Sequence, residues 1–141
     1  MESEGGRPER GIAVELPSLV SSVEKEINVP VSVQGIANKG VISYEFDLRY
    51  DASVMQPLVD PVDVKDTASR GLSVVTNAAE PGLLRVVVYG AFPIDENGVL
   101  LDLRFTAVGA AGSISPLSFE RIMFNEGEPR VSVANGKVEL F

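Results

Sequence analysis

Two carboxylates, Glu45 and Asp47, come closest to a catalytic pair in this sequence. One residue separates them in a segment where polar and apolar residues alternate, so a β-strand places both on one face, about 6.6 Å apart. That separation lies within the range used by glycoside hydrolases. A catalytic carboxylic acid, however, has its pKa raised by burial in a cleft, which two carboxylates on an open strand face lack. The pair therefore indicates a solvated or partner-facing surface.

The polar row continues on both sides of this pair, with Ser43 before it and Arg49 after it. A hydroxyl, two carboxylates and a guanidinium on one rigid strand can form a flat protein-recognition surface, in which the charge pattern sets partner choice and association rate. The same row can also be an ordinary water-facing strand. Periodicity alone does not separate these two possibilities.

The absence of histidine and cysteine limits the possible chemistry. It removes the commonest general base, the thiol nucleophile, every disulfide and most zinc sites. We therefore do not expect ordinary hydrolytic catalysis. The formal charge of −8 argues against a nucleic-acid partner and against anionic membrane surfaces. No apolar run approaches the roughly 18–20 residues of a membrane-spanning helix, so we expect no direct membrane insertion.

The remaining acidic cluster is weak as a metal site. Asp60, Asp63 and Asp66 are spaced like calcium ligands, but the stretch lacks the central glycine and the terminal glutamate of an EF-hand. Pro57 and Pro61 predict a stiff loop there instead. We expect no metal and no cofactor in this chain.

Sugar recognition would need exposed aromatic side chains. The chain has no tryptophan, and Tyr44 and Tyr50 share the phase of Phe46, which predicts that they are core residues. Tyr89 and Phe92 are the candidates that remain, both near a predicted loop. A carbohydrate-binding module on a β-sandwich is therefore kept as the alternative function, and a purely structural spacer as a third.

Alternation with period two predicts the elements that must position these residues. Strands are expected over residues 12–16, 27–33, 41–50, 72–76, 83–90, 99–108, 114–119, 130–134 and 137–141. Residues 52–56 predict one helical turn. Asp95–Gly98 and Asn135-Gly136 predict hairpin turns, because asparagine and glycine tolerate left-handed backbone.

This pattern predicts an all-β fold of two antiparallel sheets packed face to face, a jelly-roll-like or immunoglobulin-like sandwich of about nine strands. A single domain is expected over residues 11–141. Residues 1–10 are charged and lack the apolar stretch of a signal peptide, so we expect a flexible leader or the boundary of a fragment.

Several motifs resemble one known family. Val29-Pro-Val31 is followed by the loop 35–40, by the alternating segment 44–51 that ends in Tyr50-Asp51, and by Val54. Asn97-Gly98-Val99-Leu100 then precedes an alternating strand that runs through Phe105. Together these motifs resemble a cohesin domain, over residues 11–141. The resemblance extends to cohesin-like modules of bacteria and archaea that have no cellulosome.

The resemblance implies a nine-stranded jelly-roll sandwich and a non-catalytic role. It implies binding of a dockerin or dockerin-like helical module, anchoring of that partner to a scaffold or cell-surface protein outside the cell, and a part in polysaccharide degradation. Calcium is then expected on the dockerin. Aligned on the motif that ends in Tyr50-Asp51, the positions that contact the dockerin in this family correspond to Ser43 and Glu45. Asp47 and Arg49 continue that row. The neighbouring strand, 83–90, is expected to add an apolar part through Val86 and Val88.

Overall fold

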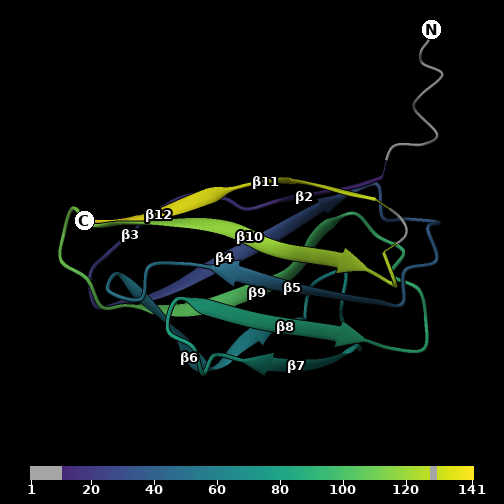
Figure 1. The fold of residues 1–141 in the computed structure, drawn as a ribbon, viewed down its shortest axis with the longest axis horizontal. Coiled ribbons are helices and arrows are strands. Elements are labelled where there is room, and N and C mark those ends of the chain that lie inside the picture. The colour runs from purple at the N-terminus through teal and green to yellow at the C-terminus, as the bar shows by residue number, and fades with distance from the viewer. Residues whose placement is uncertain (1–10, 128–129) are drawn as a thin grey trace, which may run out of the picture.

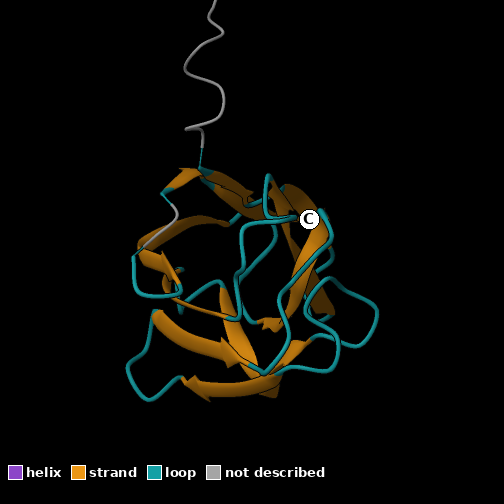
Figure 2. Ribbon diagram, turned by 90° about the vertical axis from the view of Figure 1, so that its right-hand side faces the viewer, coloured by secondary structure: helices purple, strands orange, loops and turns teal. Residues whose placement is uncertain are grey.

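The computed structural model describes residues 11–127 and 130–141, and this part of the chain consists of strands, turns and loops (Figures 1 and 2). The described residues form no helix long and apolar enough to span a membrane. The strands are β2 (Ile12–Glu15), β3 (Ser18–Ser21), β4 (Glu26–Gln34), β5 (Ser43–Arg49), β6 (Met55–Asp63), β7 (Ser73–Asn77), β8 (Leu83–Tyr89), β9 (Gly98–Ala107), β10 (Ile114–Phe124), β11 (Val131–Ala134) and β12 (Gly136–Leu140).

These strands form two sheets that pack face to face. The six-stranded sheet has the order β3-β12-β10-β5-β8-β7, and the five-stranded sheet has the order β11-β2-β4-β9-β6. The all-β sandwich predicted from the sequence is therefore confirmed. The described chain has 11 strands rather than about nine, because β3 and β6 were not predicted.

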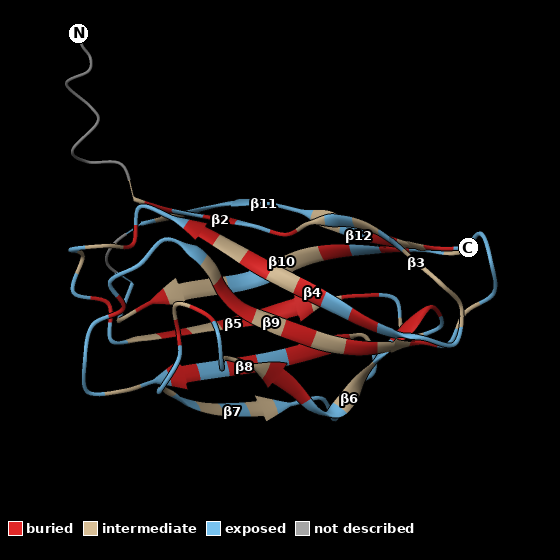
Figure 3. Cartoon of the chain, turned by 180° about the vertical axis from the view of Figure 1, so that it is seen from behind, coloured by how far each residue is buried: buried red, intermediate tan, exposed pale blue. Residues whose placement is uncertain are grey.

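The core consists of the inward phase of each strand. Tyr44, Phe46 and Leu48 on β5 are at most 1% exposed, and so is every second residue from Val29 to Val33 on β4. Figure 3 shows the resulting alternation of buried and exposed positions along the strands. Each fully buried side chain of this size contributes about 1.5–3 kcal/mol through the hydrophobic effect. The alternation predicted for these two strands is confirmed.

Strand β6 replaces the stiff loop that Pro57 and Pro61 led us to predict, so that prediction is wrong. β6 is the outermost strand of its sheet and pairs only with β9. The register shifts between Pro57 and Val62, which marks a bulge or irregularity. Proline, which has no N–H to donate, is tolerated at a sheet edge and at a bulge.

The segment before β6 does form the predicted turn. The backbone N–H groups of Val54 and Met55 both donate to the carbonyl of Asp51, and the N–H of Ser53 donates to the Asp51 carboxylate at 2.9 Å. The turn occupies residues 52–54 and the strand begins directly after it, at Met55.

Both predicted hairpins are wrong, because each joins strands of different sheets. Asp95–Gly98 connects β8 of the six-stranded sheet to β9 of the five-stranded sheet. Its side chains hold another loop instead: Asn97 accepts from the N–H of Ile36 at 3.1 Å and Asp95 accepts from the N–H of Asn38 at 3.3 Å.

Asn135-Gly136 is the second such corner, where the chain passes from β11 in one sheet to β12 in the other. Near the N-terminal end of the described chain, the connection from β2 to β3 also passes from the five-stranded to the six-stranded sheet. The two crossing segments run side by side, because β11 pairs in parallel with β2 and β12 pairs in parallel with β3. The sheets are therefore antiparallel except at this edge of the sandwich. At the corner a Cβ on Gly136 would lie 2.0 Å from the carbonyl oxygen of Pro17, so only glycine fits.

We expect Gly136→Ala to lower the free energy of unfolding by about 3 kcal/mol or more, because a new methyl group would meet backbone rather than a movable side chain. Gly71→Ala is the matched control: Gly71 has a φ of 82° but open space around its Cβ position. The left-handed backbone alone should cost about 1–2 kcal/mol there. Urea denaturation measures both, and equal losses would contradict the close crossing at Gly136.

A buried polar pair ties the loop before β7 to the inner side of β5. The hydroxyls of Tyr44 and Ser69 lie 2.7 Å apart, and both residues are at most 1% exposed. Burial raises the pKa of the Tyr44 phenol above its ordinary value. A buried hydroxyl without a partner is destabilising, so each of these groups depends on the other.

We expect Tyr44→Phe and Ser69→Ala each to lower stability by about 1–3 kcal/mol, because each leaves one buried hydroxyl unpaired. The double variant should lose less than the sum of the two, by about 0.5 kcal/mol or more, because neither hydroxyl then remains. Denaturation of all four proteins gives the coupling energy. Additive losses would mean that the pair does not act as a unit.

Candidate protein-binding face

The outer side of β7, β8, β5 and β10 forms one continuous surface, here called the four-strand face. Its members are the outward-facing residues of these strands: Ser73, Val75, Asn77, Arg85, Val87, Tyr89, Ser43, Glu45, Asp47, Arg49, Ser118, Glu120, Arg121 and Met123. The ladder aligns them in rows across the sheet. Neighbouring strands lie about 4.8 Å apart, so four strands present a nearly flat surface about 14 Å wide.

A charged row crosses the middle of the four-strand face. Arg85 on β8 and Arg121 on β10 both lie opposite Asp47 on β5. Arg85 Nε is 3.6 Å and Arg121 Nε is 3.7 Å from the Asp47 carboxylate. Arg121 also donates a hydrogen bond to Glu45, which raises the pKa of the Arg121 guanidinium. One arginine thus bridges both predicted carboxylates.

The environment of Asp47 differs from the prediction. Asp47 is on the predicted side of β5, but only 7% of its surface is exposed, because the two arginines cover it. Ser43, Glu45 and Arg49 are half-buried. Both carboxylates are engaged in ion pairs, Glu45 with Arg121 and Asp47 with Arg85 and Arg121.

Arg49 forms a second ionic cluster further along β5. Its guanidinium lies 2.9 Å from Glu120 and 3.2 Å from Glu80. The hydrogen bonds to Glu120 and then to Glu80 raise the pKa of Arg49. Exposed pairs of this kind add little to stability because water and salt screen them. They fix the directions in which the side chains point.

A bulge in β10 places two charged residues on the outer side in succession. Phe119 lies opposite Leu48 and Arg121 opposite Asp47, so Glu120 is an extra residue in the ladder. Phe119 packs inward against Phe46, and the chain turns inward again only at Ile122. Glu120 and Arg121 therefore both face outward and reach different partners on β5. Bulges commonly redirect side chains in this way.

The prediction for Val86 and Val88 is wrong. They lie opposite Phe46 and Tyr44 and are 1% and 0% exposed, so both belong to the core. The exposed phase of β8 is Arg85, Val87 and Tyr89. The three consecutive valines 86–88 are apolar on both sides of the strand, so hydrophobicity alone did not show which side faces the core. The adjacent Arg85, which must reach water, is the signal that could have set it.

An apolar strip, which we define as Val75, Val87 and Tyr89, lies beside the charged row. Val75 is 54% exposed, Val87 38% and Tyr89 47%, and Val75 lies directly opposite Val87. Phe92, in the loop after β8, is 79% exposed. The N–H of Gly90 donates to the carbonyl of Ile42 at 3.0 Å, which holds the start of this loop against the residue that precedes β5.

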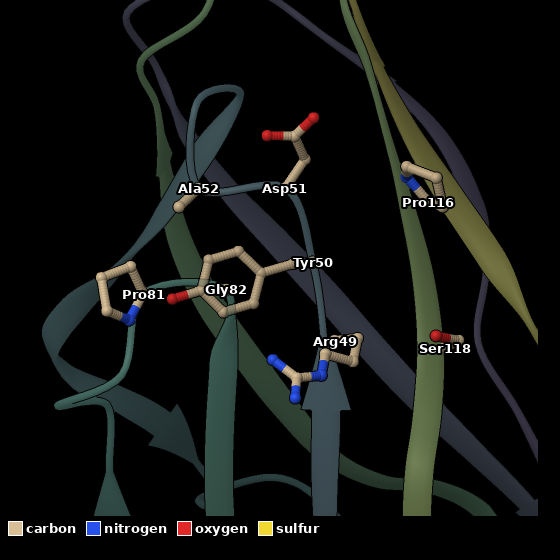
Figure 4. Close-up of a pocket in the computed structure, with 8 residues that line it drawn as sticks. All are labelled: Arg49, Tyr50, Asp51, Ala52, Pro81, Gly82, Pro116 and Ser118. Carbon is tan, nitrogen blue, oxygen red and sulfur yellow. The ribbon is translucent and has the colours of Figure 1, made fainter.

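An open cleft lies at the other end of β5, with a volume of about 500 Å³ (Figure 4). Tyr50, Ala52, Pro81 and Pro116 provide apolar lining, and Arg49, Asp51 and Ser118 provide polar groups. The Asp51 carboxylate accepts hydrogen bonds from the side chain and the backbone of Ser53, which lower its pKa. That bonding makes Asp51 a cap for the turn rather than a general acid.

The acidic residues that the structure describes do not assemble into a metal site. Asp63, one of the three spaced aspartates, accepts from the N–H of Lys65 at 2.9 Å and so stabilises a turn. In residues 11–127 and 130–141, no group of three or more His, Cys, Asp and Glu side chains is arranged to hold a metal ion.

Comparison with protein families gives a match to the cohesin domain over residues 12–139. The chain belongs to the cohesin family. This cohesin domain is 29% identical over 117 residues to cellulosomal-scaffolding protein A of Acetivibrio thermocellus, an alignment that covers 74% of the chain and 6% of that protein. It is 33% identical over 55 residues to cellulosomal-scaffolding protein B, which covers 38% of the chain and 7% of the relative. The chain thus spans only a small part of both relatives.

Solved cohesin structures have the same fold. The non-cellulosomal cohesin of Archaeoglobus fulgidus superposes with a TM-score of 0.75 at 18% identity, covering 94% of this chain and 92% of that one. The complex of the OlpA cohesin with a dockerin from Clostridium thermocellum gives 0.74 at 20% identity, covering 94% and 100%. As a cohesin domain the chain is a non-catalytic interaction module, and the carbohydrate-binding alternative gains no support.

The phase of β8 can be tested with two neighbouring valines. We expect Val86→Ala to lower the free energy of unfolding by about 2 kcal/mol, because it removes buried methyl groups. Val87→Ala, the same change one residue later, should alter it by no more than about 0.5 kcal/mol. Denaturation measures both. A reversed order would place β8 one residue out of register and remove Val87 from the four-strand face.

Proposed function

We propose that this cohesin domain binds a dockerin or dockerin-like helical module through the four-strand face, and so anchors that partner to a scaffold or cell-surface protein. The observation that carries the proposal is the family match over residues 12–139. Several of the solved cohesins with this fold are complexes with dockerins. We infer an extracellular or cell-surface location from the scaffolding proteins to which the chain is related.

The chemistry of the four-strand face supports this role. Stable recognition usually depends on a few apolar or aromatic residues surrounded by polar groups. Here the apolar strip, Val75, Val87 and Tyr89, lies beside two polar residues of β5: Ser43 is opposite Tyr89, and Glu45 is opposite Val87. The strands are rigid, so little ordering is needed when a partner docks. We assign partner contact to Ser43, Glu45, Arg49 and the apolar strip, with Asp47 as a supporting residue beneath two arginines.

The calcium that the family resemblance implies is assigned to the dockerin. We propose that chelation with EDTA would abolish binding by unfolding the partner, while the melting temperature of this domain stays unchanged.

The interface can be tested by Val87→Asp, which places a carboxylate next to Glu45 in the middle of the four-strand face. We expect affinity for a dockerin encoded in the same genome to fall at least thirtyfold, about 2 kcal/mol, with little change in melting temperature. Val133→Asp is the matched control, because Val133 is similarly exposed at 44% but lies on β11 of the other sheet. Isothermal titration calorimetry measures both.

Equal affinity of Val87→Asp and wild type would move the interface to another surface. An equal loss for Val133→Asp would show a non-specific charge effect instead. If no dockerin from that genome bound the wild-type domain, the proposed function itself would be wrong.

A further inference from the structure

We propose that Arg121 is a specificity-determining residue: by holding Glu45 and Asp47, it restricts the four-strand face to partner helices whose contact surface is uncharged. The suited partner presents apolar side chains and small hydroxyl or amide groups rather than lysine or arginine. This inference rests on the proposed function and names the chemistry of the partner surface.

The two central carboxylates are already held by arginines of this chain. Asp47 is 7% exposed beneath Arg85 and Arg121, with nitrogen–oxygen distances of 3.6 and 3.7 Å. Arg121 also donates to Glu45, and its own side chain is 49% exposed. A basic partner residue could therefore reach Asp47 only by displacing an arginine, and at Glu45, whose side chain is 32% exposed, it would compete with Arg121 for the carboxylate. The displaced guanidinium would lose two carboxylate partners, and the incoming cation would lose its hydration, so the exchange brings little net gain.

The guanidinium groups of the four-strand face are likewise paired with carboxylates of this chain. Arg49 is held between Glu80 and Glu120, so an acidic partner residue also meets a cation that already has two anions. Arg85 faces Asp47. Each of the three arginines among the described residues of the four-strand face is thus within 4 Å of a carboxylate of this chain. The face neutralises its own charges before any partner arrives.

Once these charges are paired, apolar side chains and a hydroxyl remain for recognition. The apolar strip is exposed by 38–54%, and Ser43 supplies a hydroxyl opposite Tyr89. Affinity from such a surface comes from burying apolar area, and balanced charges give little long-range attraction. Binding of an uncharged partner surface should then depend weakly on ionic strength, because the charged groups of the four-strand face are already paired within this chain.

The test selects partners instead of assuming one. A phage-displayed dockerin library, randomised at the exposed positions of its helices, is panned against the wild-type domain, Arg121→Gln and Arg104→Gln. Arg104 lies on β9 in the other sheet and provides the same loss of charge. We expect wild type and Arg104→Gln to enrich apolar and small polar residues, and Arg121→Gln to enrich lysine or arginine.

The selected binders give the quantitative result. A lysine-bearing binder should prefer Arg121→Gln over wild type at least tenfold at low salt, and about 0.5 M NaCl should remove most of that preference. The double variant Glu45→Gln/Arg121→Gln should lose most of that preference, because Glu45 is then uncharged and Asp47 still faces Arg85. The neutral binder of wild type should change in affinity by less than about threefold over the same salt range. If Arg121→Gln does not fold, Arg121→Met is used in its place, because methionine keeps more of the aliphatic packing.

Enrichment of lysine or arginine by the wild-type domain would overturn this inference and leave the proposed function intact. Equal selections by wild type and by both Arg121 variants would also overturn it. If the wild-type domain enriched no dockerin variant at all, the proposed function would fail, and the inference with it.

Discussion

The burial of Tyr44, Phe46 and Leu48 along one side of β5 is the constraint on which the rest of the structure depends. These side chains fill the centre of the sandwich, and they also join the neighbouring strand: Tyr44 stacks on Phe124 at 5.4 Å and Phe46 meets Phe119 edge to face at 5.3 Å. Because side chains alternate along a strand, fixing this row inside fixes Ser43, Glu45, Asp47 and Arg49 outside. Core packing and the four-strand face thus depend on the same seven residues of β5.

The partners of β5 complete that surface in different ways. β8 supplies the exposed valine and tyrosine of the apolar strip, and β10 supplies the guanidinium that holds both central carboxylates. Neither contribution is large in stability, since exposed ion pairs and exposed valines contribute little to folding. The consequence lies in geometry: a rigid sheet holds apolar and ionic groups in adjacent rows, so a partner meets a preorganised pattern.

The sequence predicted those elements in which one phase was clearly polar. β4 and β5 have that property, and the strands, the core residues and the outward row on β5 followed from it. The phase of β8 could not be predicted in this way, because Val86, Val87 and Val88 are consecutive and place apolar residues on both sides of the strand. β6 was missed because its two prolines predicted a loop. A sheet edge and a bulge both tolerate proline, but the edge depends on the order of strands in the sheet. The same holds for Asn135-Gly136, whose local residues suit a hairpin although the next strand belongs to the other sheet.

The bulge in β10 has an evolutionary consequence. Phe119 and Arg121 lie opposite neighbouring residues of β5, so the ladder would be regular if Glu120 were deleted, and no other side chain would change sides. Conversely, inserting one codon into a regular strand at this point would add an outward-facing residue and keep every other side chain on its side of the sheet. Substitution can change a sheet face only one existing position at a time. Insertion at a bulge enlarges the set of positions, and Glu120, which reaches Arg49 at 2.9 Å, has the geometry of a residue gained in that way.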